Sequence, residues 1–257
     1  MSTSVAIVMC TRDCPRPYLK HWLEYHLSIG ATHIYLYDNE SIDLVEPFDD
    51  NRITLKRWEG AHAQTAIYQD ALQIIKNEGL YEWVAFIDDD EYIIIPDYTL
   101  PEFLYCCVPP FAAGVTLSWK NFGSSGIEET LSDGNVFKSF SYCLPKTDQF
   151  NYFVKTISRV NQIFTVFNPH FCLYNGNSLP VSTDWKIKAI GERSNEVFYD
   201  KAWVNHYFTR TKEDFAVKIN RGTGDKTEKN YYTWEKFDSI NKRCTEIYSG
   251  QKGKIII

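Results

Sequence analysis

The first third of the chain alternates short apolar runs with longer segments in which apolar residues recur every three or four positions. The short runs are bounded by polar residues, as in strands that are buried on both faces of a parallel sheet. The longer segments have the periodicity of helices with one buried face. Strands are predicted at Val5 to Met9, His33 to Tyr37, Ile53 to Trp58 and Trp83 to Ile87, and helices at Pro17 to Ile29 and Ala63 to Lys76.

This order of elements predicts an α/β fold in which helices make right-handed crossovers between the strands of a sheet. Ligands of such sheets bind at the carboxyl ends of the strands. The second half of the chain differs, because its apolar runs are separated by turns rich in Gly, Ser, Asn and Asp. It predicts strands at Gly114 to Trp119, Phe137 to Leu144, Phe153 to Val160 and Ile163 to Phe167, and a helix at Lys212 to Ile219.

Length and charge limit the possible functions. A chain of 257 residues is near the upper limit for one hydrophobic core, and we expect a single domain. The net charge of −6 argues against nucleic-acid binding, because such proteins concentrate Lys and Arg against phosphates. A phosphate-bearing ligand is therefore expected to arrive with a cation. The aromatic content of 16% is high, and it suits sugar binding as well as core filling.

The sequence predicts no membrane insertion. The apolar run from Val5 to Cys10 is too short for the core of a signal peptide. No run approaches the roughly 18 apolar residues that a membrane helix needs. Seven cysteines lack metal-ligand spacing, so we expect reduced thiols. We expect a cytoplasmic protein, in the host cytoplasm if the chain is viral, without a membrane span.

A run of four acidic residues, Asp88 to Glu91, directly follows the strand predicted at Trp83 to Ile87. Side chains alternate along extended backbone, so Asp88 and Asp90 are expected on the same side. Neighbouring carboxylates repel one another, and a bound Mg²⁺ or Mn²⁺ is the simplest way to keep them ionised. A calcium loop is excluded because Ile93 stands where that loop needs Gly. The alternative is a solvated acidic turn.

Six segments stand in a characteristic order and spacing: 19–30 (LKHWLEYHLSIG), 34–43 (IYLYDNESID), 83–92 (WVAFIDDDEY), 119–126 (WKNFGSSG), 169–170 (PH) and 205–222 (NHYFTRTKEDFAVKINRG). Together they resemble the GT-A glycosyltransferases of family 92 and related bacterial and viral enzymes of the family 2 type. The resemblance implies a GT-A, Rossmann-like fold with a mixed, mostly parallel sheet flanked by helices. It also implies one domain over residues 1–257, in which 1–118 bind the nucleotide sugar and 119–257 bind the acceptor. Asp89 departs from the family, which often has an apolar residue there, and the donor is left open.

The resemblance further implies a DxD-type site. In it Asp88 lies near the donor ribose and the cation, Asp90 binds Mn²⁺ or Mg²⁺, and Glu91 supports both. By the same analogy, polar residues after the first two strands hold the uracil and ribose of a UDP-sugar, although turn capping is an alternative role for them. Gln64 and Asp70 on the second predicted helix are further candidates for the nucleotide, unless they are simply exposed. The residues after the strands are Thr11, Arg12, Asp13, Asp38 and Asn39.

Further candidates come from the second half. Enzymes of this fold commonly take another metal ligand from a late histidine, and His170 is favoured over His206, although either also fits a core role. Lys218 and Arg221 are three residues apart, so they share a helix face on which they would clamp a diphosphate, unless that face is merely solvated. Residues 222–230 are expected to be mobile and to close over bound donor.

The segment from Trp119 to Gly126 combines aromatic rings with small hydroxyl residues, which stack on and hydrogen-bond to sugars. We predict an acceptor wall there, with an ordinary hairpin turn as the alternative. Its expected contacts are Trp119, Phe122, Gly123, Ser124 and Ser125. An inverting displacement also needs a carboxylate base. The sequence ranks none of the acidic residues of this half, which include Glu128, Glu129, Asp133 and Asp184.

We therefore predict metal-dependent transfer of a sugar from a UDP-sugar to a hydroxyl of a glycan or glycoconjugate, with inversion. A nucleotidyltransferase acting on sugar phosphates is an alternative, but it would carry a Gly-rich loop after the first strand, and residues 10–13 (CTRD) contain no Gly. A non-catalytic carbohydrate-binding module is a second alternative, although it would not need the acidic strand end.

Overall fold

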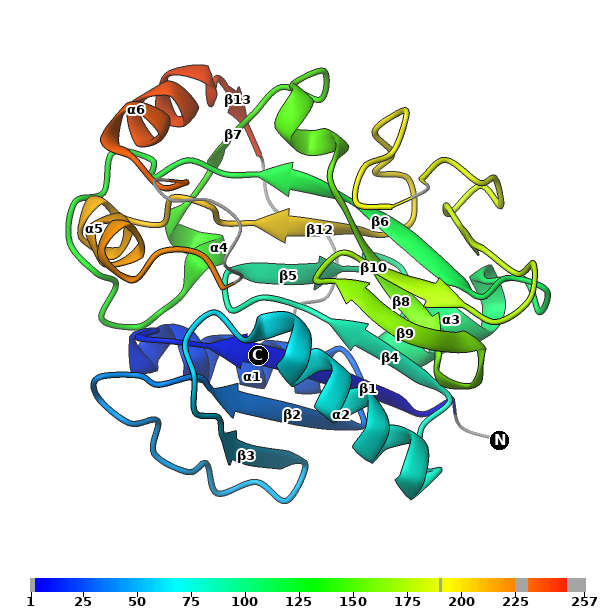
Figure 1. Cartoon of the computed structure of the whole chain (residues 1–257). Helices are drawn as coiled ribbons and strands as arrows, with labels where there is room; N and C mark the ends of the chain where they lie inside the picture. The colour runs from blue at the N-terminus through cyan, green and yellow to red at the C-terminus, as the bar shows by residue number, and fades with distance from the viewer. Residues whose placement is uncertain (1–2, 190, 225–230, 249–257) are drawn as a thin grey trace.

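The structure is a computed structural model that describes residues 3–189, 191–224 and 231–248. Its main sheet contains β1 (Val5–Thr11), β2 (His33–Asp38), β3 (Ile53–Arg57), β4 (Trp83–Phe86), β5 (Glu91–Ile94), β6 (Gly114–Asn121), β8 (Val154–Arg159), β11 (Pro180–Val181) and β12 (Trp203–His206). The strands follow the order β3-β2-β1-β4-β8-β6-β12-β5, with β11 beside β6 (Figure 1). Within this sheet, β8 pairs antiparallel with β4 and β6, and β5 pairs antiparallel with β12. The other strand pairs are parallel. The predicted mixed, mostly parallel sheet is confirmed.

Helices cover both faces of this sheet. The helices are α1 (Arg16–Ser28), α2 (Gln64–Glu78), α3 (Leu100–Cys107), α4 (Val136–Ser139), α5 (Lys212–Arg221) and α6 (Trp234–Arg243). Side chains alternate along β1, so Ala6 and Val8 face the cluster formed with α2, whereas Ile7 and Met9 face the cluster formed with α1 and α3. Figure 1 shows α2 in front of the sheet and α1 behind it. Within the described ranges, no helix is both long and apolar enough to cross a membrane.

The strands and helices predicted in the first half are present within one or two residues of their expected bounds. The strand predicted at Phe137 to Leu144 is wrong. Asn135 accepts a hydrogen bond from the Lys138 amide and starts the short helix α4, which leaves only β7 (Tyr142–Cys143) as strand. β7 pairs with β13 (Glu246–Ile247), and β9 (Ile163–Asn168) pairs with β10 (Phe171–Tyr174). Short 3₁₀ turns at Gln149–Tyr152 and Val160–Gln162 flank β8.

The pairing of the strands brings their ends to one edge of the sheet. β1 and β2 end side by side at Thr11 and Asp38, and β6 and β12 end side by side at Asn121 and His206. The acidic turn after β4 lies between these two pairs, because β5, which begins at Glu91, returns against β12. The edge therefore joins residues of both halves of the chain.

Gly134 and Gly79 offer a matched test of how the second half is anchored. Both have φ of +64°, but a Cβ on Gly134 would lie 2.2 Å from the Pro17 carbonyl oxygen at the start of α1, whereas Gly79 has open space. Gly79→Ala is expected to cost about 1–2 kcal/mol of unfolding free energy, from the left-handed conformation alone. Gly134→Ala is expected to cost more, because backbone must also move. Urea unfolding measures both, and equal losses would contradict this packing.

Candidate active site

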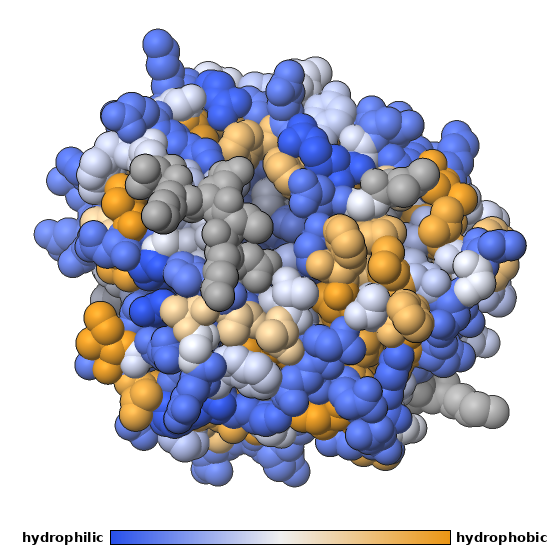
Figure 2. Space-filling model, in the orientation of Figure 1, coloured by the Kyte–Doolittle hydropathy of each residue, from blue (hydrophilic) through white to orange (hydrophobic). Residues whose placement is uncertain are grey.

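A cavity of about 530 Å³ opens at the edge where the strands end. This volume is within the range of small-molecule sites. Figure 2 shows this face hollowed near its centre, beside apolar side chains that lie over β9 and β10. The predicted site residues that line the cavity are Thr11, Arg12, Asn39, Gln64, Asp88, Asp90, Trp119, His170, His206 and Arg221, and Asp89 lines it as well.

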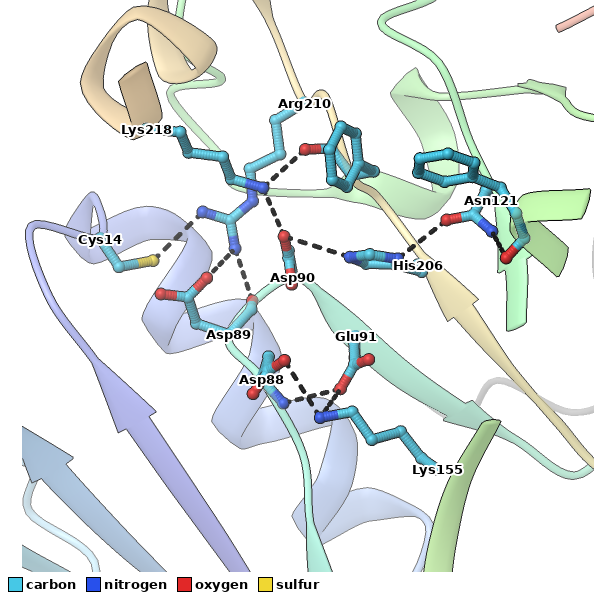
Figure 3. A network of polar contacts seen from close by, with 12 residues as sticks. Cys14, Asp88, Asp89, Asp90, Glu91, Asn121, Lys155, His206, Arg210 and Lys218 are labelled. Atoms are coloured by element: carbon cyan, nitrogen blue, oxygen red, sulfur yellow. Dashed lines mark hydrogen bonds and ion pairs between the residues drawn. The ribbon is translucent and has the colours of Figure 1, made fainter. Parts of the chain in front are cut away.

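The acidic residues form a turn and not an extended strand, with the Glu91 amide donating to the Asp88 carbonyl at 3.1 Å. The alternation from which we predicted a common side for Asp88 and Asp90 therefore does not apply. Figure 3 shows the three aspartates directed toward different partners. All three aspartates nevertheless line the same cavity, because the turn is tight.

Asp88 is held by two residues of α2 and one residue of β8. Its Oδ1 accepts hydrogen bonds from Gln64 at 2.6 Å and from the Tyr68 hydroxyl at 3.0 Å, and its Oδ2 pairs with Lys155 of β8 at 3.0 Å. The Asp88 side chain remains 27% exposed. Its carboxylate is therefore fixed in place while still accessible from the cavity.

Glu91 lies behind Asp88 and is completely buried. Its Oε2 accepts a hydrogen bond from the Asp88 amide at 2.8 Å and pairs with Lys155 at 3.0 Å. Burial raises the pKa of Glu91 above its usual value even though Lys155 opposes that shift. Burial also lowers the pKa of Lys155, but Asp88 and Glu91 outweigh this effect and raise it. Glu91 is hydrogen-bonded to the turn and does not line the cavity.

Asp89 and Asp90 are paired with cations from the other half of the chain. Arg210 donates to the Asp89 carboxylate at 3.1 Å and also to its carbonyl, and Thr11 donates to the same carboxylate at 2.8 Å. Asp90 is bound by Lys218 of α5. Burial would raise the pKa of Asp90, but Lys218 and His206 hold it well below its usual range.

Each aspartate of the turn therefore has a cation supplied by the protein: Lys155 for Asp88, Arg210 for Asp89 and Lys218 for Asp90. This pairing weakens one argument made from the sequence, that a bound metal is the simplest way to keep the carboxylates ionised, because the protein supplies cations of its own. It also corrects the role of Lys218, which is 2% exposed behind Asp90 and does not reach the cavity surface. Arg221 does line the cavity.

A separate observation concerns His206, whose Nε2 lies 3.5 Å from Asp90 Oδ2. The amide nitrogen of Asn121 donates to Phe150 and Asn151, so its Oδ1 accepts from His206 Nδ1 at 2.8 Å. Nδ1 then carries the proton of the neutral ring, and the lone pair of Nε2 faces a carboxylate oxygen. Two electron-pair donors placed in this way fit two ligands of one cation.

His170 also lines the cavity, but its ring is hydrogen-bonded to the main chain. Its Nδ1 donates to the Val154 carbonyl at 2.9 Å. Burial lowers the pKa of His170 to about 3, so the ring is neutral near pH 7. Of the two histidines predicted as metal-ligand candidates, His206 is the one that faces an aspartate of the turn, although the sequence favoured His170. In the described residues no three His, Cys, Asp or Glu side chains form a complete protein-only metal site.

Three residues predicted to contact the donor do not line the cavity and have structural contacts instead. Asp38 is buried, pairs with Arg57 at 2.8 Å, and accepts from the amides of Ser41 and Val45. Asp13 accepts from the Ile42 amide at 2.7 Å. Both shape the loops behind the cavity and do not line it. Asp70 likewise binds Tyr37 and Lys56 outside the cavity.

Only Trp119 of the predicted acceptor wall lines the cavity. Its ring lies 4.1 Å from that of His206, 5.1 Å from that of Phe153 and 5.1 Å from that of His170, measured between centroids. The other four residues turn away beneath α6 and β7. Phe122 is fully buried, Gly123 and Ser124 pack against Asn241, and Ser125 accepts from the amides of 141 and 142.

The candidate bases named from the sequence also lie elsewhere. Glu128 is exposed beside Lys212, and Asp184 lines a separate cavity of about 340 Å³ together with Lys188. Glu129 and Asp133 are exposed and do not line the main cavity. Of the segment predicted to close over the donor, Gly222 to Gly224 line the cavity, and residues 225–230 lie outside the described residues.

Lys155 and Arg210 were missed from the sequence. A lysine among Val, Thr, Ile and Ser, in a strand that ends at Arg159, is a signal that a buried carboxylate partner is needed, because an unpaired buried charge is costly. Arg210 has no comparable signal, since it lies in a loop just before α5.

Comparisons with known proteins agree on one family. A sequence model described as Glycosyltransferase family 92 matches residues 16–246. A family 92 glycosyltransferase from Ricinus communis is 35% identical over 85 residues, which are 31% of this chain and 15% of that protein. A longer alignment to a protein of the same name is 24% identical over 221 residues, covering 79% of this chain and 35% of that protein.

A family 92 protein from Oryza sativa subsp. japonica is 31% identical over 117 residues, which are 42% of this chain and 20% of that protein. The chain thus spans about a third or less of the length of these relatives. Among solved structures, HddC from Yersinia pseudotuberculosis has a TM-score of 0.38 and 14% identity, over 84% of this chain and 97% of that chain. This likeness is too low to add to the description of the fold.

Replacing Lys155 tests how strongly the turn depends on its buried cation. Lys155→Met removes the cation from the fully buried Glu91 and from the partly buried Asp88, and we expect a loss of about 3–5 kcal/mol in unfolding free energy. The control is Lys56→Met, since Lys56 pairs with Asp70 at 2.8 Å but is 35% exposed. We expect it to cost less than about 1 kcal/mol. Urea unfolding at neutral pH gives both values, and similar losses would show that Lys155 is not needed for charge balance.

Proposed function

Because the chain belongs to glycosyltransferase family 92, we propose that its cavity binds a nucleoside-diphosphate sugar and transfers the sugar to a hydroxyl of a glycan or glycoconjugate. The expected donor is a UDP-sugar and the expected outcome is inversion. The observation that carries this proposal is the cavity at the strand ends, where the acidic turn faces His206 and Arg221.

We assign the nucleoside to the side of the cavity formed by the first half. Thr11 ends β1, Arg12 and Asn39 follow β1 and β2, and all three line this side, while Gln64 lies at the first turn of α2. Asp88 keeps an exposed carboxylate, which would accept hydrogen bonds from ribose hydroxyls. Arg12 and Arg221 would balance the charge of the diphosphate, since guanidinium groups suit phosphate oxygens.

A divalent cation, Mn²⁺ or Mg²⁺, fits between Asp90 and His206. Such ions are commonly bound by one or two protein ligands, with substrate phosphates and water completing the coordination. The two facing electron-pair donors supply that number, and the Asn121 contact fixes the ring of His206 in the required tautomer. When bound, the cation would offset the charge that develops on the diphosphate leaving group.

The second half supplies the surface for the sugar and the acceptor. Trp119 and Phe153 line the cavity with rings 5.1 Å apart, and aromatic faces stack on sugars. These residues lie across the cavity from the nucleoside side, so donor and acceptor would meet above the acidic turn.

A panel of UDP- and GDP-sugars with Mn²⁺ tests the activity. Release of the nucleoside diphosphate, slow without acceptor, is expected from a glycosyltransferase. Pyrophosphate release would instead support a nucleotidyltransferase. Binding of glycans with no turnover of any donor would support a non-catalytic module, and the proposal would then fail.

Asp90→Asn tests the cation site. The amide keeps the size of the side chain but weakens its binding of a cation, so UDP affinity in Mn²⁺ should fall about 10–100-fold. Chelation with EDTA should weaken UDP binding to the unaltered protein and have little effect on the variant. Isothermal titration measures these affinities, and circular dichroism checks the fold. Asp70→Asn, outside the cavity, is the control, and an unchanged affinity in Asp90→Asn would reject the assignment.

A further inference from the structure

Among the residues that the structure describes, four acidic side chains line the main cavity, namely Asp88, Asp89, Asp90 and Glu192. The three aspartates are each paired with a lysine or arginine of the protein. Glu192 is different, because in the described part of the chain it forms no ion pair. Its carboxylate contacts the side-chain amide of Asn168 at 3.4 Å, and its side chain is exposed. Among the described residues, the Glu192 carboxylate is therefore the acidic group of the cavity that does not neutralise a lysine or arginine of the protein.

The backbone of Glu192 is fixed although its side chain is exposed. The Val154 amide donates to the Glu192 carbonyl at 3.0 Å, and the Ser194 amide donates to the Tyr152 carbonyl at 2.8 Å. Arg193, between them, lies over the ring of Phe153 at 4.4 Å. The segment is thus attached to the beginning of β8, at the same edge of the sheet as the acidic turn.

This attachment places Glu192 on the aromatic side of the cavity. The Val154 carbonyl accepts from His170, while the Val154 amide donates to Glu192, so the two residues flank the same peptide segment. Phe153 and Trp119 line this side as well. The nucleoside contacts proposed above lie on the other side, after β1 and β2. A base for the acceptor is needed on the aromatic side, where the acceptor hydroxyl would approach.

We propose that Glu192 is the general base that deprotonates the acceptor hydroxyl, an assignment that rests on the proposed transferase function. In this step the acceptor oxygen forms a bond to the anomeric carbon, and its proton passes to the Glu192 carboxylate. The bond from that carbon to the diphosphate oxygen breaks, and its electron pair leaves with the diphosphate. No oxidant, reductant or further reactant is needed, and the configuration at the anomeric carbon inverts.

Glu192→Gln tests this role, with Glu196→Gln as the matched control. Glu196 lies four residues further along the same loop, pairs with Lys188 and does not line the cavity. Glu192→Gln should lower kcat for transfer by about 10²–10⁴-fold, the usual contribution of a general base. Its UDP affinity in Mn²⁺ should be unchanged, and the acidic limb of the pH profile of kcat/KM should disappear. Glu196→Gln should keep both the rate and the pH profile.

Azide distinguishes a chemical role from a structural one. Azide is already an anion and needs no base, so Glu192→Ala with UDP-sugar and azide should form a glycosyl azide of inverted configuration. A merely structural role of Glu192 would give no such rescue.

The outcomes separate the two proposals. If the unaltered protein neither binds nor cleaves any nucleotide sugar, the transferase function fails. If it transfers sugar and Glu192→Gln retains a rate within about threefold, the base assignment alone is wrong. A product of retained configuration would also overturn the base assignment, while leaving the transferase function in place.

Discussion

The charge pairing of the acidic turn is the constraint on which the rest of the structure depends. Three consecutive aspartates are compressed at the end of β4, where their mutual repulsion would open the turn in the absence of opposite charge. Lys155, Arg210 and Lys218 supply that charge, and all three come from the second half of the chain. Forming the turn therefore requires the two halves to be joined, and the same contacts that stabilise the fold build the floor of the cavity.

This arrangement gives the aspartates different roles despite their identical chemistry. Asp89 is almost fully enclosed by Arg210 and Thr11, so it anchors the turn. Asp88 is held from behind by Lys155 and keeps part of its carboxylate accessible. The Asp90 carboxylate pairs with Lys218 and also faces Nε2 of His206. An anchored turn of this kind presents its remaining oxygens without further rearrangement, which is the preorganisation that electrostatic catalysis needs.

The cavity has two chemically different sides because two kinds of strand end meet there. Parallel strands of the first half end in polar loops, which suit a nucleotide. On the other side, β8 begins near the residue where β6 ends, because these two strands pair antiparallel, and this brings Phe153 next to Trp119. Glu192 is attached to that beginning through main-chain hydrogen bonds. A donor and an acceptor would thus meet between a polar and an aromatic wall.

The sequence by itself determined the features that depend on neighbouring residues. The apolar runs of β1, β2 and β4 and the periodicity of α1 and α2 are local patterns, and so is the position of the acidic run after a buried strand. Local pattern also places Thr11 and Asn39 at strand ends and Gln64 at a helix start, whereas the nucleotide role expected of them came from the resemblance to the family. Local pattern failed where a cap competed with a strand, as at Asn135.

Only the tertiary structure decided which charges meet. Lys155 is 67 residues from Asp88, Arg210 is 121 from Asp89, and Lys218 is 128 from Asp90. No periodicity connects positions so far apart, so the sequence left the aspartates without partners and assigned that role to a metal. Contacts between distant parts of the chain also place Glu192 in the cavity, which the sequence did not predict. Asp13, Asp38 and Phe122 were predicted to belong to the site but do not line the cavity. The sequence gives the type of each side chain. The pairing of the strands determines which neighbour fixes the charge and the direction of that side chain.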